Sequence, residues 1–205
     1  MGQYYKPLLI ADDGTKQTAY SHDYGNGLKL MEHSWVGNNF VNAVLQNLDS
    51  NPQRLAWIGD YADCVTEEDC HFGGGYIDDR DTFMKLFKAV WCNEDGVEEK
   101  VTKIDKSQPE YRLSNEEADC FVVNLTKNCY IDMEKYVAEN KKKDGEHFWC
   151  INPVPLLTSI GNGRGGGDYR GCDDNWDVGS WAFDKIYISA LRPGNMEEVM
   201  YYFSE

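Results

Sequence analysis

Apolar residues recur along this chain with a helical spacing in two segments. After Asp81 they stand at positions i, i+3, i+4, i+7 and i+8, namely Phe83, Leu86, Phe87, Val90 and Trp91. This spacing places them on one face of a helix that Asp81 caps. A second helix, capped by Asn38 or Asn39, carries the same kind of stripe and ends before Pro52. Both stripes predict helix faces that pack against a core.

Two segments far apart in the chain have the layout of a β-hairpin. The first runs from the apolar residues Pro7–Ile10 through the polar turn Asp12–Gly14 to a second strand at Thr18–Ser21. The second runs from the apolar residues Phe121–Leu125 through the turn Thr126–Asn128 to a second strand at Cys129–Asp132. Short apolar runs that are bounded by turn residues predict strands.

Three further segments complete the predicted elements. Lys185–Ser189 alternates between polar and apolar residues, which predicts a strand. Pro153–Ile160 is typical of a short helix, and Asn195 with Glu198 forms a capping-box pattern for a helix near the C-terminus. Glu139–Glu146, which contains three consecutive lysines, is predicted to be an exposed loop. The whole set predicts an α+β fold with a mixed or antiparallel sheet and a few helices.

A Trp-x-x-Asp motif follows each predicted hairpin and suggests an internal duplication. The first copy runs from Trp57 to Asp60 and the second from Trp181 to Asp184. If the halves are related by a pseudo-twofold axis, the two tryptophans occupy equivalent, buried strand positions. The two aspartates then form a candidate pair of carboxylates for acid–base chemistry.

The duplication implies a definite domain layout. We expect a single domain, residues 1–205, in which hairpin–helix–strand repeats at 4–63 and 119–189 flank an acidic insert at 64–118. Residues 60–119 contain 17 Asp or Glu and 7 Lys or Arg, so they carry −10 of the chain's net charge of −15. The acidic excess therefore lies mainly in the middle of the chain.

Composition excludes several classes of protein. With 41% hydrophobic residues, six tryptophans and thirteen tyrosines in 205 residues, the chain buries a real core despite its charge. The net charge of −15 disfavours non-specific binding to nucleic acid or to an anionic membrane, because both require a basic surface. No apolar run approaches the roughly 18–20 residues of a membrane span. The N-terminus also lacks the layout of a signal peptide, and the seven cysteines are scattered, so we expect a cytoplasmic protein with reduced thiols.

The densest local signal is a glycine-rich run at residues 161–169, where five of nine residues are glycine. Consecutive backbone N–H groups in such a run form a concave site for an anion, and Arg164 adds a positive charge. The order of residues matches neither a P-loop nor a dinucleotide-binding fingerprint. A ligand-binding loop and a structural turn therefore both remain open. The candidate ligand-binding residues are Asn162, Arg164, Asp168, Tyr169, Asp184 and Asp60.

No complete catalytic or metal-binding set accompanies this run. His22, Glu32 and His33 lie in a glycine-flanked region, where they provide candidates for a general base. The carboxylates near the run lack the spacing of an EF-hand loop, and the Cys and His residues lack a tight zinc-knuckle spacing. We therefore expect neither a metal nor a cofactor, and we favour a protein that is not an enzyme.

Five short pieces of the sequence together support a resemblance to known proteins, namely Met1–Tyr5, Tyr24–Leu30, Trp57–Asp63, Gly161–Asp168 and Trp181–Ala182. In these pieces the chain resembles a group of bacterial and phage proteins of unknown function. Members of that group begin with Met-Gly-Gln-Tyr-Tyr and carry a Gly-Asn-Gly-Arg-Gly-Gly-Gly-Asp run followed by Trp-Ala-Gly-Asp. Phe183 stands where the group has the glycine of the last motif. The resemblance implies an intracellular protein of prokaryotic or viral origin and implies no activity.

These observations favour a binding protein. We expect an intracellular acidic protein that associates with a basic surface of a protein partner, as inhibitors and immunity proteins do. The alternative reading of the acidic excess is a solvated surface without a partner. The alternative function is a small-molecule or nucleotide-ligand site, in a binding protein or an enzyme, that is built on Gly161–Tyr169.

Overall fold

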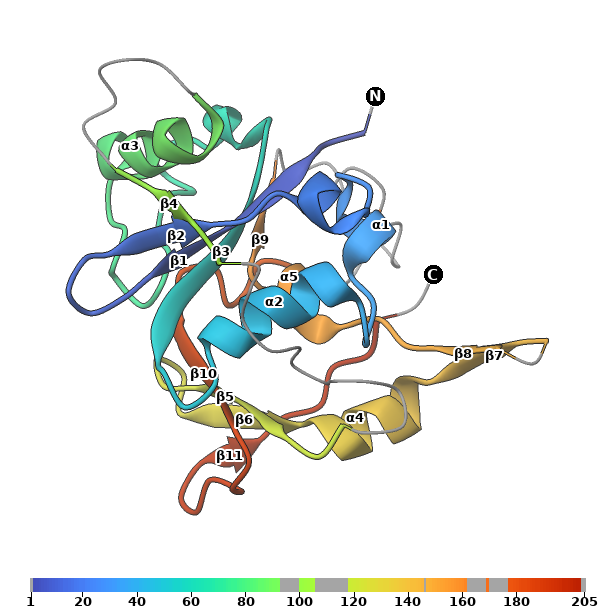
Figure 1. Ribbon diagram of the computed structural model, residues 1–205. Coiled ribbons are helices and arrows are strands. Elements are labelled where there is room, and N and C mark those ends of the chain that lie inside the picture. The colour runs from blue at the N-terminus through green and yellow to red at the C-terminus, as the bar shows by residue number, and fades with distance from the viewer. Residues whose placement is uncertain are drawn as a thin grey trace.

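The computed structural model describes residues 2–92, 100–105, 118–145, 147–161, 169 and 177–203. These residues form a central sheet with helices packed against it (Figure 1), which confirms the predicted α+β fold. The α-helices in the described residues are α1 (Leu30–His33), α2 (Asn39–Asn47), α3 (Arg80–Trp91), α4 (Met133–Asn140) and α5 (Pro153–Leu157). The same residues also form the short 3-10 helices η1 (Ser21–Tyr24) and η2 (Ala62–Cys64).

Most of the strands belong to one mixed sheet. Its strands are β1 (Tyr5–Ile10), β2 (Lys16–Thr18), β3 (Gln53–Gly59), β4 (Thr102–Lys103), β5 (Phe121–Asn124), β6 (Cys129–Asp132), β9 (Ser159–Ile160), β10 (Lys185–Ser189) and β11 (Glu197–Glu198). Their order is β11-β6-β5-β10-β3-β1-β2-β4, and β9 pairs with β3 outside this path. A separate two-stranded sheet joins β7 (Lys142–Asp144) to β8 (His147–Trp149). The two predicted hairpins are present as β1–β2 and β5–β6. The second strand of the first hairpin, β2, ends at Thr18 and so covers only the first residue of the predicted Thr18–Ser21.

Strand β3 shows why both faces of the central sheet are covered. Successive side chains on a strand point to opposite faces, and on β3 both sets are buried. Leu55 and Trp57 belong to a core that includes residues of α2, α4 and α5. Ala56 and Ile58 belong to a second core, which includes the apolar face of α3. The helix that lies within the predicted acidic insert therefore packs directly on the sheet.

Side-chain caps determine where α2 and α3, the two longest helices of the described residues, begin. Asn38 caps α2, because its side-chain oxygen accepts hydrogen bonds from two backbone N–H groups of the first turn at 2.9 and 3.2 Å. Helix α3 begins at Arg80, one residue before the predicted cap Asp81. Its cap is Asp79, whose carboxylate accepts hydrogen bonds at 2.7 Å from both the backbone N–H and the hydroxyl of Thr82. The prediction placed the helix correctly and its cap two residues too late.

The lysine-rich segment Glu139–Glu146 is not a loop in its described part. It supplies the end of α4 and the strand β7, which forms the projecting hairpin with β8 (Figure 1). Lys141 lies 4.3 Å from the ring centroid of Phe148, and Lys142 lies 5.0 Å from that of Trp149. Cation–π contacts across the two strands give these lysines partners that the sequence pattern did not reveal.

The predicted helix near the C-terminus is also wrong. Residues Glu197 and Glu198 form β11, which pairs in parallel with β6. The carboxylate of Glu198 accepts hydrogen bonds from the hydroxyl of Tyr130 at 3.0 Å and from the ammonium of Lys135 at 2.6 Å. These tertiary contacts override the local capping pattern.

The predicted duplication is not confirmed. A hairpin flanks each side of the central antiparallel pair β3–β10, with β1–β2 on one side and β5–β6 on the other. However, Trp57 lies on β3, whereas Trp181 lies in a turn that ends before β10 begins. The two tryptophans are fully buried, as predicted, but they do not occupy equivalent strand positions.

Candidate functional site

The glycine-rich run is described only at its two ends. Three of its candidate residues lie outside the described residues, namely Asn162, Arg164 and Asp168. At the far end, Tyr169 is 7% exposed, and its ring centroid lies 6.0 Å from that of Phe203. A ring that is buried in this way contributes to the core, so Tyr169 does not present its face to a ligand in solvent.

At the near end, Gly161 meets the N-terminal segment. A Cβ atom at Gly161 would lie 2.6 Å from the hydroxyl of Tyr5 and 2.8 Å from Oε1 of Gln3. A Cβ atom at Gly59 would also collide with the side chain of Gln3. The hydroxyl of Tyr5 donates a hydrogen bond to Oε1 of Gln3 at 3.1 Å, and Gln3 is buried. A side chain at either glycine would displace Gln3 from this packing, which brings the N-terminal piece and the start of the run together.

Asp60 closes the same end of the sheet. Its carboxylate accepts a hydrogen bond from the backbone N–H of Tyr4 at 3.0 Å, and its own N–H donates to the carbonyl of Tyr4 at 2.9 Å. Tyr4 also forms a β-bridge with Lys29. The carbonyl of Leu28 accepts a hydrogen bond from the N–H of Tyr5 at 2.9 Å. Asp60 thus joins the end of β3 to the segment at Tyr4, which in turn pairs with the segment at Leu28 and Lys29.

Asp184 lies in a different part of the molecule. It is 2% exposed, and its Oδ2 accepts a hydrogen bond from the side-chain amide of Asn124 at 2.7 Å. Burial raises the pKa of this carboxyl, and the bond from Asn124 offsets part of the rise. The carbonyl of Asp184 accepts a hydrogen bond from the backbone N–H of Leu55, so Asp184 lies beside Leu55 on β3. Asp60 follows Leu55 by five residues, and five residues of extended chain span about 16 Å. The predicted pair of carboxylates does not form.

Phe183 has a backbone conformation that favours glycine. Its φ is +58°, in the left-handed region where a Cβ atom is unfavourable. Its N–H donates to the carbonyl of Leu55 at 2.8 Å, and its carbonyl accepts from Nη1 of Arg54 at 3.0 Å. These two bonds hold the conformation, while the ring is fully buried in the core beside α3.

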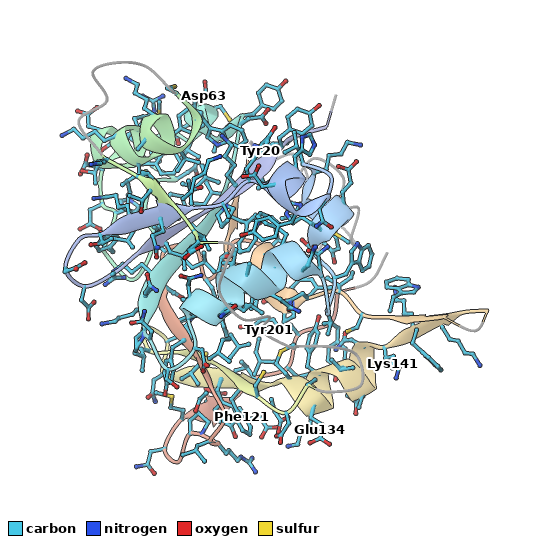
Figure 2. All side chains as sticks on the ribbon, viewed as in Figure 1. Tyr20, Asp63, Phe121, Glu134, Lys141 and Tyr201 are labelled. Carbon is cyan, nitrogen blue, oxygen red and sulfur yellow. The ribbon has the colours of Figure 1, made fainter. Side chains whose placement is uncertain are left out.

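Carboxylates gather on the surface around η2 and the start of α3. Residues 60–81 contain eight Asp or Glu and one cation, Arg80. We define the acidic surface as the six exposed members of this set, namely Asp63, Glu67, Glu68, Asp69, Asp78 and Asp81. Figure 2 places Asp63 beside α3. The described part of the predicted acidic insert therefore concentrates its charge on one region of the molecule.

Arg80 does not form an ion pair with the acidic surface. Its Nε donates to the carbonyl of Val65 at 2.9 Å, and its Nη2 donates to the backbone carbonyl of Asp63 at 2.9 Å. Among the described residues, the ion pairs within 4.0 Å involve none of the six carboxylates. Their negative potential therefore extends into solvent.

Two tyrosines are exposed beside these carboxylates. Tyr61 is 42% exposed and Tyr76 is 40% exposed. The guanidinium of Arg54 lies 4.1 Å from the ring centroid of Tyr76 and donates to the carbonyl of Gly73, so the segment that carries Tyr76 is attached to the sheet. The acidic surface thus includes aromatic area that is held in a defined position.

His33, a candidate general base, is fully buried. Its Nε2 accepts a hydrogen bond from the indole N–H of Trp57 at 3.0 Å, and its Nδ1 lies 3.2 Å from the carbonyl oxygen of Gly27. Because a carbonyl only accepts, the proton of the neutral ring is on Nδ1. Burial lowers the pKa of His33 to about 4. His33 joins the segment Gly27–Lys29 (the Gly27 segment) to β3 and is not accessible to a substrate in solvent.

Neither a metal-binding cluster nor a membrane-spanning helix is present among the described residues. The described part of the chain contains no group of three or more His, Cys, Asp or Glu side chains that is placed to hold a metal ion. No helix among the described residues is long and apolar enough to cross a membrane.

Comparison with known proteins adds no functional information. No protein-family model, curated protein or solved structure matches the chain. The features of this chain that bear on function are the acidic surface and the end of the sheet where the glycine-rich run begins.

Proposed function

We propose that this protein binds a basic protein partner through the acidic surface. The observation that carries the proposal is the charge of residues 60–81, which contain eight carboxylates and one arginine. The side chain of that arginine donates its hydrogen bonds to backbone carbonyls and not to the carboxylates. Like charges at this density repel one another in the free protein. A cationic partner relieves that repulsion, so binding is favoured. The role is that of an inhibitor or immunity-type protein, and it requires no catalysis.

Charge and aromatic area contribute different parts of the binding. Complementary charge steers the partner toward the surface and increases the association rate by about 10–10³-fold at low salt. Tyr61 and Tyr76 offer apolar area with a polar hydroxyl, a combination that is enriched at protein interfaces. Their rings also accept cation–π contacts from an arginine of the partner.

A pair of charge-matched variants tests this proposal. The first replaces three members of the acidic surface, Asp63→Lys, Glu68→Lys and Asp78→Lys. The control replaces three exposed acids elsewhere, Asp119→Lys, Glu139→Lys and Glu197→Lys, so that both variants have the same net charge. Each immobilised protein is used to capture basic proteins from a cell lysate, at low salt and at about 0.5 M salt, where the Debye length falls to roughly 4 Å.

We expect the native chain and the control variant to capture the same basic protein at low salt and to lose it at high salt. The surface variant should fail to capture it at either salt concentration. Equal capture by the two charge-matched variants would exclude the acidic surface as the binding site. Capture that is unchanged at high salt would exclude the electrostatic mechanism.

A second candidate function is the binding of a small molecule or phosphorylated ligand by the glycine-rich run. It is favoured by the packing of Gly161 against Gln3 and Tyr5, which anchors the start of the run at the end of the sheet. A thermal-shift panel of nucleotides, sugar phosphates and divalent metals tests it. A ligand at 100 times its Kd should stabilise the protein by about 2.7 kcal/mol, and Arg164→Ala should abolish the shift. The absence of a shift with every compound would refute it.

A further inference from the structure

His33 connects two parts of the chain through both nitrogens of its ring. Its Nδ1–H donates to the carbonyl of Gly27 at 3.2 Å, and its Nε2 accepts from the indole of Trp57 at 3.0 Å. The ring of Phe40, on α2, packs edge-on at a centroid distance of 5.0 Å. Because His33 is fully buried, water does not substitute for either hydrogen bond.

Protonation of the ring is incompatible with this arrangement. Both nitrogens of a charged imidazole are donors, so Nε2–H and the indole N–H of Trp57 would face each other. Phe40 and Trp57, which face the ring from α2 and β3, carry no charge. In the described residues the charged group that acts on His33 is Glu32, on the same helix. The carboxylate of Glu32 already accepts a hydrogen bond from the N–H of Lys29 and lies 3.5 Å from its ammonium.

The segment that contains Gly27 leads directly to the end of the sheet described above. The next carbonyl along the chain, that of Leu28, accepts a hydrogen bond from Tyr5 at 2.9 Å. The residue after it forms a β-bridge with Tyr4, and Tyr4 is bonded in turn to Asp60. Movement of the Gly27 segment therefore removes hydrogen bonds from the edge of β1.

We propose that His33 is a pH-sensitive switch: protonation of its ring releases the Gly27 segment from β3 and loosens the Tyr4–Asp60 end of the sheet. The proposal goes beyond the binding function and does not depend on the acidic surface. Acid opens this end of the sheet, while the half of the sheet that contains β5 and β10 remains folded. Because burial lowers the pKa of His33 to about 4, the folded protein opens only in acid.

Hydrogen exchange and NMR on the full chain test the switch, from about pH 7 to about pH 3.5. The first reporter is the amide of Tyr5, which is bonded to Leu28. The second is the amide of Ile188 on β10, which donates to the carbonyl of Leu48 at 2.9 Å. We expect the protection of Tyr5 to fall by at least about tenfold as the His33 ring titrates, whereas Ile188 stays protected. In His33→Gln, whose amide donates and accepts without titrating, Tyr5 should stay protected over the same range.

Three results would overturn the proposal. Tyr5 keeps its protection after His33 has titrated, or Tyr5 and Ile188 lose protection together in a global unfolding transition, or Tyr5 loses protection at the same pH in His33→Gln. If the variant does not fold, the comparison of Tyr5 with Ile188 in the native chain still decides between local opening and global unfolding.

Discussion

Replacing Phe183 by alanine and by glycine separates the cost of its backbone conformation from the contribution of its ring. Both changes remove a fully buried phenylalanine, and the loss of such a ring to alanine costs about 3–5 kcal/mol. Alanine at φ +58° keeps a left-handed strain of about 1–2 kcal/mol, which glycine does not have. Glycine loses roughly 0.4–1 kcal/mol through the greater entropy of its unfolded chain. The balance favours glycine by about 1 kcal/mol, so Phe183→Gly should be the more stable variant.

Urea denaturation at neutral pH measures this difference as the free energy of unfolding. The matched control is Phe87, which is buried on the same side of the sheet but lies within α3. There, Phe87→Gly should be less stable than Phe87→Ala by about 1 kcal/mol, because glycine is unfavourable inside a helix. The order of stability should therefore reverse between the two sites. If Phe183→Ala is as stable as Phe183→Gly, the backbone at this position is not strained and the reasoning is wrong.

Two further predictions concern stability. The free energy of unfolding should fall by about 3 kcal/mol between pH 6.5 and pH 4, since the unfolded chain binds a proton at the ordinary pKa of 6.5 whereas folded His33 binds it only near its pKa of about 4. Stability is thus retained above pH 6.5 and lost as the pH falls, and denaturant titrations should show a smaller loss in His33→Gln. Trp57→Ala and Trp181→Ala should each cost about 3–5 kcal/mol, because both indoles are fully buried, and thermal denaturation followed by circular dichroism checks this. A change below about 1 kcal/mol in either variant would contradict the core position of that tryptophan.

The sequence by itself determined the elements whose formation is local. The stripe from Phe83 to Trp91 predicted the helix that covers one face of the sheet, and Asn38 was one of the two residues predicted to cap the other. The runs Pro7–Ile10 and Phe121–Leu125 predicted the first strands of the two hairpins. Helical periodicity, capping and tight turns depend on residues a few positions apart, so they can be read from the chain. The concentration of acid in residues 60–119 is equally a property of the sequence alone.

The tertiary structure alone decided which of these pieces meet. Asp60 and Asp184 each end a Trp-x-x-Asp motif, but they lie at different positions along β3. The reason is that Trp57 is on a strand whereas Trp181 is in a turn. The sequence made His33 a candidate general base, whereas the structure buries its ring in the core with a hydrogen bond from the indole of Trp57. Strand order, side-chain burial and hydrogen-bond partners arise from contacts between residues far apart in the chain, and a local pattern carries no information about which partner is chosen. Long apolar stripes and tight turns therefore predicted local structure, whereas the capping pattern at Asn195 and Glu198 and the paired aspartates failed because distant strands determine those positions.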